Sequence, residues 1–225
     1  MINFYEICPN HFSRNKTIVM FHGWCSTIES QINLGNELST LGFKVVIPEI
    51  KYHDTRQALN NHFDQKVLQS YFWKTIFYTI NEENELMNTL NLKKEETILF
   101  GSSMGGFIAS GIFFSNTSYA GLININGSSS FVFSEKDFCN KAGRSIEENY
   151  LATIEKYDPK FSGNVNNKPI LFLHGDKDRV ISIDGQIDFV ASNNHDIQFL
   201  KYKDVNHTIT NRMKTDLINR LDKSF

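Results

Sequence analysis

The chain has 225 residues, of which 40% are hydrophobic and 21% charged, and its formal net charge is −2. This length favours a single domain, residues 1–225, with a substantial core. The weak net charge and the lack of a basic run exclude the patterns typical of nucleic-acid binding and of attachment to an anionic membrane. The three cysteines form no C-x-x-C pair, and no targeting segment is evident, which favours a reducing, cytoplasmic location.

Short apolar segments alternate along the chain with longer helical patterns. The predicted strands are, in chain order, 17–21, 44–47, 96–100, 121–125, 169–173 and 196–201. The predicted helices are 29–41, 73–90, 105–114, 185–191 and 212–221. Several strands are apolar throughout, as is typical of strands covered on both faces. The alternation predicts an α/β fold with a mostly parallel sheet and helices on both faces.

Two segments interrupt this alternation. Residues 52–72 are polar and are predicted to form a long connection. Residues 127–168 contain scattered aromatic residues and two helix-compatible patches, 135–143 and 146–156. This second segment is either a small lid-like insert over a site or a pair of surface helices, and the sequence leaves both interpretations open.

The most informative motif is G-x-S-x-G at Gly101-Ser102-Ser103-Met104-Gly105, between a predicted strand and a predicted helix. In that context the motif predicts a sharp strand-to-helix turn that holds out the hydroxyl of Ser103. The glycines leave room for a crowded backbone, and the helix N-terminus offers N–H groups to a developing oxyanion.

A serine nucleophile needs a nearby base, and that base needs an acid to orient it. Ligands of parallel sheets bind outside the carboxyl ends of the strands, so the residues that follow later strands are the candidates. Asp176 and Asp178 both follow the strand predicted at 169–173. His207 is the one histidine after the last predicted strand. The order serine, acid, histidine matches that of α/β-hydrolases.

From residue 17 to about residue 216 the chain resembles an α/β-hydrolase of the small bacterial carboxylesterase type, similar to dienelactone-hydrolase and prolyl-oligopeptidase-like catalytic domains. The motifs that carry the resemblance are His22-Gly23-Trp24, Gly101 to Gly105, His174 to Ile181 and Asn206-His207.

The resemblance implies an α/β-hydrolase fold and a role for each motif. Its H-G-x-x-D pattern selects Asp178 over Asp176 as the acid, with Ser103 as nucleophile and His207 as base. It also implies an oxyanion hole made by the backbone N–H groups of Trp24 and Met104.

Three features depart from the family pattern, one of them being Ser182, which replaces the proline that often follows the aspartate motif. The strand before His22 begins close to the N-terminus, so the usual first antiparallel strand is expected to be shortened or missing. Asp54 stands where related esterases have glycine in a P-x-x-x-x-H-G-x-R stretch, and the pattern therefore assigns no role to His53 or Arg56.

The predicted function is cleavage of small carboxylic esters through an acyl-enzyme, without a cofactor or metal. Histidines are scattered, but no pair lies at i, i+4 beside a carboxylate. Cys25 lacks the strand-to-helix turn of a nucleophile and is expected to pack. His22 and His174 are expected to shape their loops. The alternatives are a peptidase or thioesterase with the same residues, and a non-catalytic binding protein on the same fold.

Overall fold

The computed structural model describes residues 2–116, 118–162 and 168–225. Its centre is a seven-stranded sheet with the order β1-β3-β2-β4-β5-β6-β7. Only β1 runs antiparallel to its neighbour, and the other pairs are parallel. The strands are β1 Phe4–Ile7, β2 Thr17–Phe21, β3 Lys44–Pro48, β4 Thr97–Ser102, β5 Gly121–Ile125, β6 Ile170–Gly175 and β7 Ile197–Tyr202. This arrangement confirms the predicted parallel sheet.

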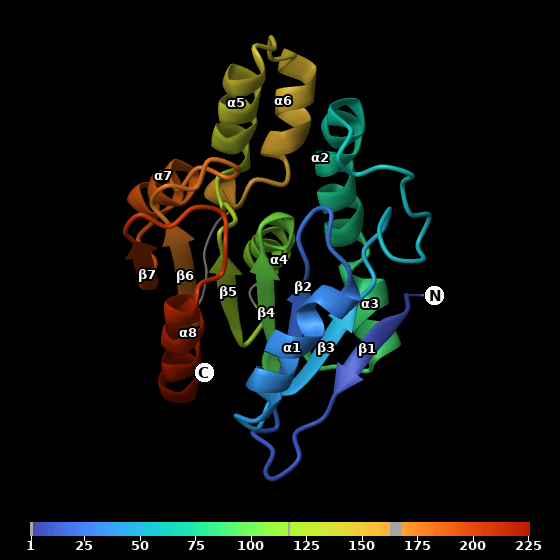
Figure 1. The fold of residues 1–225 in the computed structure, drawn as a ribbon, viewed down its shortest axis with the longest axis vertical. Coiled ribbons are helices and arrows are strands. Elements are labelled where there is room, and N and C mark those ends of the chain that lie inside the picture. Colours follow the sequence, from blue (N-terminus) through green and yellow to red (C-terminus); the bar gives the residue numbers. More distant parts are fainter. Residues whose placement is uncertain (1, 117, 163–167) are drawn as a thin grey trace.

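Helices cover both faces of the sheet, as predicted (Figure 1). The α-helices are α1 Ile28–Ser39, α2 Gln65–Asn81, α3 Glu83–Leu90, α4 Met104–Ser115, α5 Phe131–Ala142, α6 Glu148–Glu155, α7 Asp184–Ser192 and α8 Asn211–Ser224. Two 3-10 turns, η1 Lys94–Glu96 and η2 Pro159–Phe161, complete the set. Helices α1 and α8 pack on one face, whereas α2, α3, α4 and α7 pack on the other. The two faces therefore have separate apolar cores.

The central strands are buried along their whole length, which explains why they are apolar on both sides. Every residue of β2, β4, β5 and β6 is buried. Helix α4 is also buried almost all round, because it lies between the sheet and α2. The serine motif joins β4 to α4, so it sits at the most enclosed part of the fold.

The expectation for the first strand is confirmed, whereas two other elements differ from the prediction. A short strand, Phe4–Ile7, pairs antiparallel with β3, so the first strand is shortened and not lost. The predicted connection 52–72 is helical from Gln65 onward, because the Asp64 carboxylate caps that helix by accepting from the N–H groups of Lys66 and Val67. The predicted helix 73–90 is interrupted at Glu82, whose carboxylate accepts two hydrogen bonds from Arg56.

The segment 127–168 forms α5, α6 and η2 within its described residues, and its residues 163–167 lie outside them. Helices α5 and α6 stand side by side beyond the carboxyl ends of β4 and β5, at the top of Figure 1. The upper end of α2 lies next to them in the same view. The helices of the insert are therefore at the end of the sheet where the serine motif lies. No helix among the described residues is long and apolar enough to cross a membrane.

Candidate active site

Ser103 occupies a sharp turn between β4 and α4, with φ 55° and ψ −124°. Such dihedral angles are unfavourable for a residue with a side chain and persist only where the surroundings enforce them. The glycines on either side permit the turn. A Cβ on Gly101 would lie 1.9 Å from the Gly105 carbonyl oxygen, and a Cβ on Gly105 would lie 2.1 Å from that of Phe21. Close contacts between backbone atoms therefore require the two glycines of the motif.

The structure brings Ser103, His207 and Asp178 together, although they come from three distant segments of the chain. The Oγ of Ser103 lies 2.9 Å from Nε2 of His207. Nδ1 of the same imidazole lies 2.6 Å from Oδ2 of Asp178. The carboxylate is fully buried, and the imidazole is 21% exposed. The side of the imidazole that carries Nε2 can therefore meet a ligand, while Nδ1 is held by Asp178.

The alternative acid, Asp176, makes different contacts. Its Oδ1 accepts from the backbone N–H of Asp204 at 2.7 Å, so Asp176 joins two loops. The Oδ1 of Asp178 accepts from the N–H groups of Val180 and Ile181, each at 2.9 Å. These two bonds fix the Asp178 carboxylate and leave Oδ2 for histidine. Contact with His207 thus distinguishes Asp178 from Asp176, which the order of residues along the chain could not do.

The surroundings of Asp178 favour its ionised form. Burial by itself would raise the pKa of this carboxyl, but hydrogen bonds from His174 and His207 and the charge of His207 oppose it, so the pKa lies well below its ordinary value. His174 contributes through Nε2, which is 3.0 Å from the Ile181 carbonyl and 3.3 Å from Oδ2 of Asp178. An ionised Asp178 keeps the imidazole proton on Nδ1, which leaves Nε2 free to accept from Ser103.

The loop that follows β2 passes directly against Ser103. A Cβ on Gly23 would lie 3.0 Å from Cβ of Ser103, so glycine permits this approach. Neither the Trp24 nor the Met104 N–H donates to another group in the part of the chain that the structure describes. The resemblance places the oxyanion hole on these two residues, and both of their backbone N–H groups are without partners among the described residues.

His22 ties this loop to a segment that the sequence patterns left without a role. Its Nδ1 lies 2.9 Å from the Gly23 carbonyl, and its Nε2 lies 3.0 Å from Oδ2 of Asp54. The other oxygen of Asp54 accepts from the Ile28 N–H at 2.9 Å. Asp54, the departure from the family pattern, thus braces the loop. The signal available in the sequence was a carboxylate at a position where glycine is usual.

His53 is buried in an aromatic cluster next to this brace. Its ring centroid lies 5.0 Å from that of Trp24 and 4.3 Å from that of His62. Burial, reinforced by the neighbouring His22, lowers the pKa of His53 to about 3. Its Nε2 is buried without a hydrogen-bond partner among the described residues. The cluster therefore holds a neutral imidazole against the aromatic ring of Trp24.

A cavity of about 400 Å³ opens beside Ser103. Its walls come from α2 and α5, from the loop that carries Trp24, and from the segment that follows Asp178. Trp24 and Ser103 are both among its lining residues, so the hydroxyl faces a space large enough for a small organic molecule.

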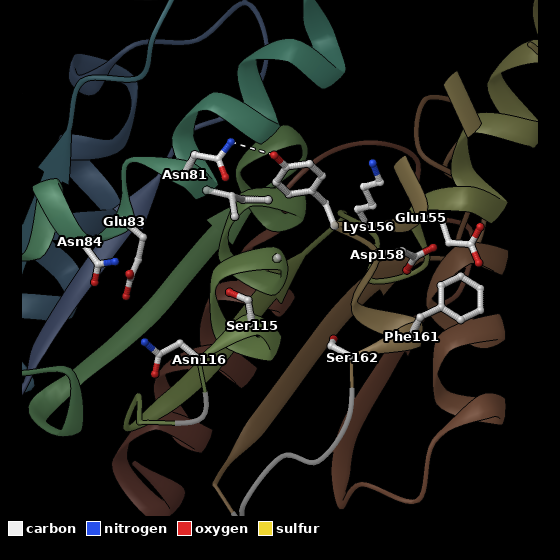
Figure 2. A pocket seen from close by; sticks show the side chains of 13 residues that line it. Asn81, Glu83, Asn84, Ser115, Asn116, Glu155, Lys156, Asp158, Phe161 and Ser162 are labelled. Carbon is white, nitrogen blue, oxygen red and sulfur yellow. Dashed lines mark hydrogen bonds between the residues drawn. The ribbon is translucent and has the colours of Figure 1, made fainter. Parts of the chain in front are cut away.

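A second, larger cavity of about 620 Å³ lies away from this site (Figure 2). It is lined by the C-terminal ends of α2 and α4 and by the segment from Glu155 to Ser162, and Asn81 donates to the Tyr157 hydroxyl at 2.8 Å beside it. None of the predicted site residues lines it, and two of its walls, Asn116 and Ser162, adjoin residues outside the described ranges. The volume of a cavity alone therefore does not identify the active site.

Within the described ranges, no group of three or more His, Cys, Asp or Glu side chains is arranged to hold a metal ion. Cys25 lies in the loop after β2 at φ 59° and is exposed, so the expectation that it packs is wrong. Desolvation raises the pKa of its thiol, which disfavours the thiolate that a nucleophile requires. Cys25 is therefore a poorer candidate nucleophile than Ser103.

Comparisons with known proteins bear on the fold of the chain. Residues 16–111 match the family model described as alpha/beta hydrolase fold. A Bacillus subtilis (strain 168) protein with the name "Putative esterase YitV" is 26% identical over 180 residues, which cover 73% of this chain and 69% of that protein.

Two solved structures illustrate the likeness of fold. The monoacylglycerol lipase of Paleococcus ferrophilus has a TM-score of 0.73 at 13% identity, with all of both chains covered. The acylaminoacyl peptidase of Pyrococcus horikoshii has a TM-score of 0.72 at 16% identity over all of this chain and 39% of that one. The sheet order, the family match over residues 16–111 and these likenesses together show that the chain has the α/β-hydrolase fold and is similar to proteins of that fold, one of them named as an esterase.

Proposed function

We propose that the chain is a serine hydrolase that cleaves small carboxylic esters through an acyl-enzyme on Ser103. The observation that carries the proposal is the pair of contacts that link Ser103 to His207 at 2.9 Å and His207 to Asp178 at 2.6 Å. The proposal treats residues 1–225 as one domain in which the segment 127–168 is an insert covering the cavity.

Each group has a defined part in this reaction. Ser103 Oγ attacks the ester carbonyl carbon while Nε2 of His207 takes the hydroxyl proton. The N–H groups of Trp24 and Met104 stabilise the negative charge on the carbonyl oxygen. The C–O bond to the alcohol then breaks, and His207 gives the proton to the departing alkoxide. Water repeats the sequence and releases the acid, with Asp178 stabilising the imidazolium in both halves.

The proposal is for an ester and not for a large peptide because of the size of the cavity. A space of about 400 Å³ accommodates a small molecule beside Ser103. No metal or cofactor has a part in the proposed steps. Rates measured on matched esters, thioesters and aminoacyl amides would separate the esterase from a thioesterase or peptidase that uses the same residues.

The test is the loss of turnover when Ser103 is replaced. For Ser103→Ala we expect the kcat on p-nitrophenyl butyrate to fall by roughly 10⁴-fold, as for removal of a nucleophile. A fluorophosphonate probe should label the native protein once, at Ser103, and should not label the variant.

Ser102→Ala is the matched control, because it removes the neighbouring hydroxyl and should still be labelled. Labelling of a folded Ser103→Ala variant, or unchanged turnover, would refute the proposal. Folded native protein that neither turns over nor takes the label would favour a non-catalytic binding protein.

A cytoplasmic location is also part of the proposal. Its support is that Cys8, Cys25 and Cys139 are all free thiols, as is usual in a reducing compartment. Fractionation of cells that express the tagged chain would test it.

A further inference from the structure

The cavity beside Ser103 combines an apolar interior with charged side chains of one predominant sign. Its apolar walls are Trp24, Leu68, Phe72, Trp73, Phe138, Val180 and Ile181. Three cationic residues, Lys141, Arg144 and Arg179, also line it, against a single carboxylate, that of Glu135. The whole chain has a formal charge of −2, so this concentration of positive charge is local to the cavity.

The single carboxylate is already engaged by the protein. Glu135 is buried, and its Oε2 accepts from the indole N–H of Trp73 at 2.7 Å. Its Oε1 accepts from the Cys139 thiol at 3.2 Å. The Glu135 charge is therefore shared between donors in the cavity wall and neutralises the nearby cations only in part.

The three cations retain donors for a ligand. Arg144 meets Glu135 only at 3.7 Å, and its Nε is buried without a hydrogen-bond partner among the described residues. Arg179 makes no ion pair in the described part of the chain, and its side chain is exposed. Lys141 is paired with Asp137 at 2.6 Å, and its Nζ lies 3.5 Å from the Arg179 carbonyl oxygen. The end of α5 and the segment after Asp178 thus present cations together.

We infer that the substrate is an ester whose apolar part fills this cavity and carries a carboxylate, which Arg144 and Arg179 bind. Arginine suits this task because its planar guanidinium matches a carboxylate. The inference rests on the proposed function, which supplies the ester bond and its cleavage at Ser103. In the reaction, water provides the oxygen that joins the acyl carbon, the alcohol leaves with a proton, and the substrate carboxylate is unchanged.

Kinetics on matched substrates tests this inference. The first pair is mono-p-nitrophenyl adipate and p-nitrophenyl hexanoate, in which the acyl group does or does not carry a carboxylate. The second pair, 4-acetoxybenzoate and its methyl ester, places the charge on the leaving group. We expect kcat/KM to favour the charged member of at least one pair by roughly tenfold or more, mainly through KM. The preference should weaken as salt is raised, because salt screens exposed charges.

Substitution of the arginines identifies the source of the preference. In Arg144→Gln and Arg179→Gln we expect the ratio of kcat/KM between charged and neutral members to fall several-fold in each, and further in the double variant. Arg220→Gln, which removes an exposed arginine whose guanidinium contacts Gln198 outside the cavity, should keep the native ratio. A ratio near one in the native protein for both pairs, or a ratio unaffected by either cavity substitution, would overturn the inference.

Binding to Ser103→Ala separates this inference from the proposed function. By calorimetry, the inactive variant should bind mono-p-nitrophenyl adipate more tightly than p-nitrophenyl hexanoate, and Arg144→Gln in that background should reduce the difference. Equal binding, together with normal turnover of neutral esters by the native protein, would overturn the carboxylate inference and leave the esterase intact. A clear binding preference without any native turnover would support the carboxylate site and refute the esterase.

Discussion

The serine turn and the helical insert both border the same cavity, but they are built in different ways. At the turn, backbone atoms meet so closely that a Cβ on Gly101 would lie 1.9 Å from a carbonyl oxygen. In the insert, a Cβ on Gly143, which ends α5, would meet nothing within 4 Å. The turn is therefore fixed by contacts between main-chain atoms, whereas the backbone at the end of α5 in the insert has open space around it. In the proposed reaction, catalysis therefore depends on the placement of the backbone, and the choice of substrate depends on side chains that can be replaced.

Replacing one glycine in each region tests the comparison most directly. Gly101→Ala should lower the free energy of unfolding by about 3 kcal/mol or more, because the added methyl cannot fit against main-chain atoms. Gly143→Ala should cost about 1 kcal/mol, the strain of a left-handed residue at φ +62°. Urea unfolding of both variants measures the difference.

Failure to recover folded Gly101→Ala agrees with the expectation. Equal losses in the two variants would show that the turn is no more tightly packed than the insert.

The pH dependence of stability tests the aromatic cluster behind the turn. The folded pKa of His53 is about 3, below the value near 6.5 of an unfolded histidine. The unfolded state therefore binds more protons between these values, and the stabilising contribution, complete above pH 6.5, is lost as the pH falls toward 3. Between pH 6.5 and 5 the loss should be roughly 1.5 kcal/mol.

His53→Gln should remove this part of the pH dependence, measured as the free energy of unfolding in urea at each pH. His22, His62 and Asp54 face His53 and stay in place in this variant. His11→Gln, at an exposed position, is the control and should keep the native slope. An unchanged slope in His53→Gln would mean that another group accounts for the acid sensitivity.

The smallest of these effects belongs to the insert. Phe138 lines the cavity from α5, and its ring packs on Phe72 with centroids 5.6 Å apart. Phe138→Ala should shift the preferred acyl length of p-nitrophenyl esters upward, with relative kcat/KM changing by about tenfold across the series. A uniform fall at all lengths would instead indicate that the insert supports the catalytic groups themselves.

The sequence predicted the parts of the molecule whose geometry repeats between proteins. The buried strands and the turn at Ser103 were recognisable because apolar runs and glycine spacing report backbone constraints directly. The Asp64 cap of α2 was missed, because the cap lies in a polar segment that resembles a loop. The brace from Asp54 to His22 was also missed, since a contact between residues 32 positions apart has no local pattern. The cations around the cavity come from separate segments, so only the fold shows that they meet.

The dihedral angles of Ser103 lower the stability of the folded protein. A residue at φ 55° and ψ −124° is held in a conformation that glycine adopts freely. Ser103→Gly should therefore make the molecule more resistant to thermal unfolding, by about 1 kcal/mol, while removing the hydroxyl. Calorimetry of that variant would measure how much thermal stability the protein loses by keeping a reactive hydroxyl at this position.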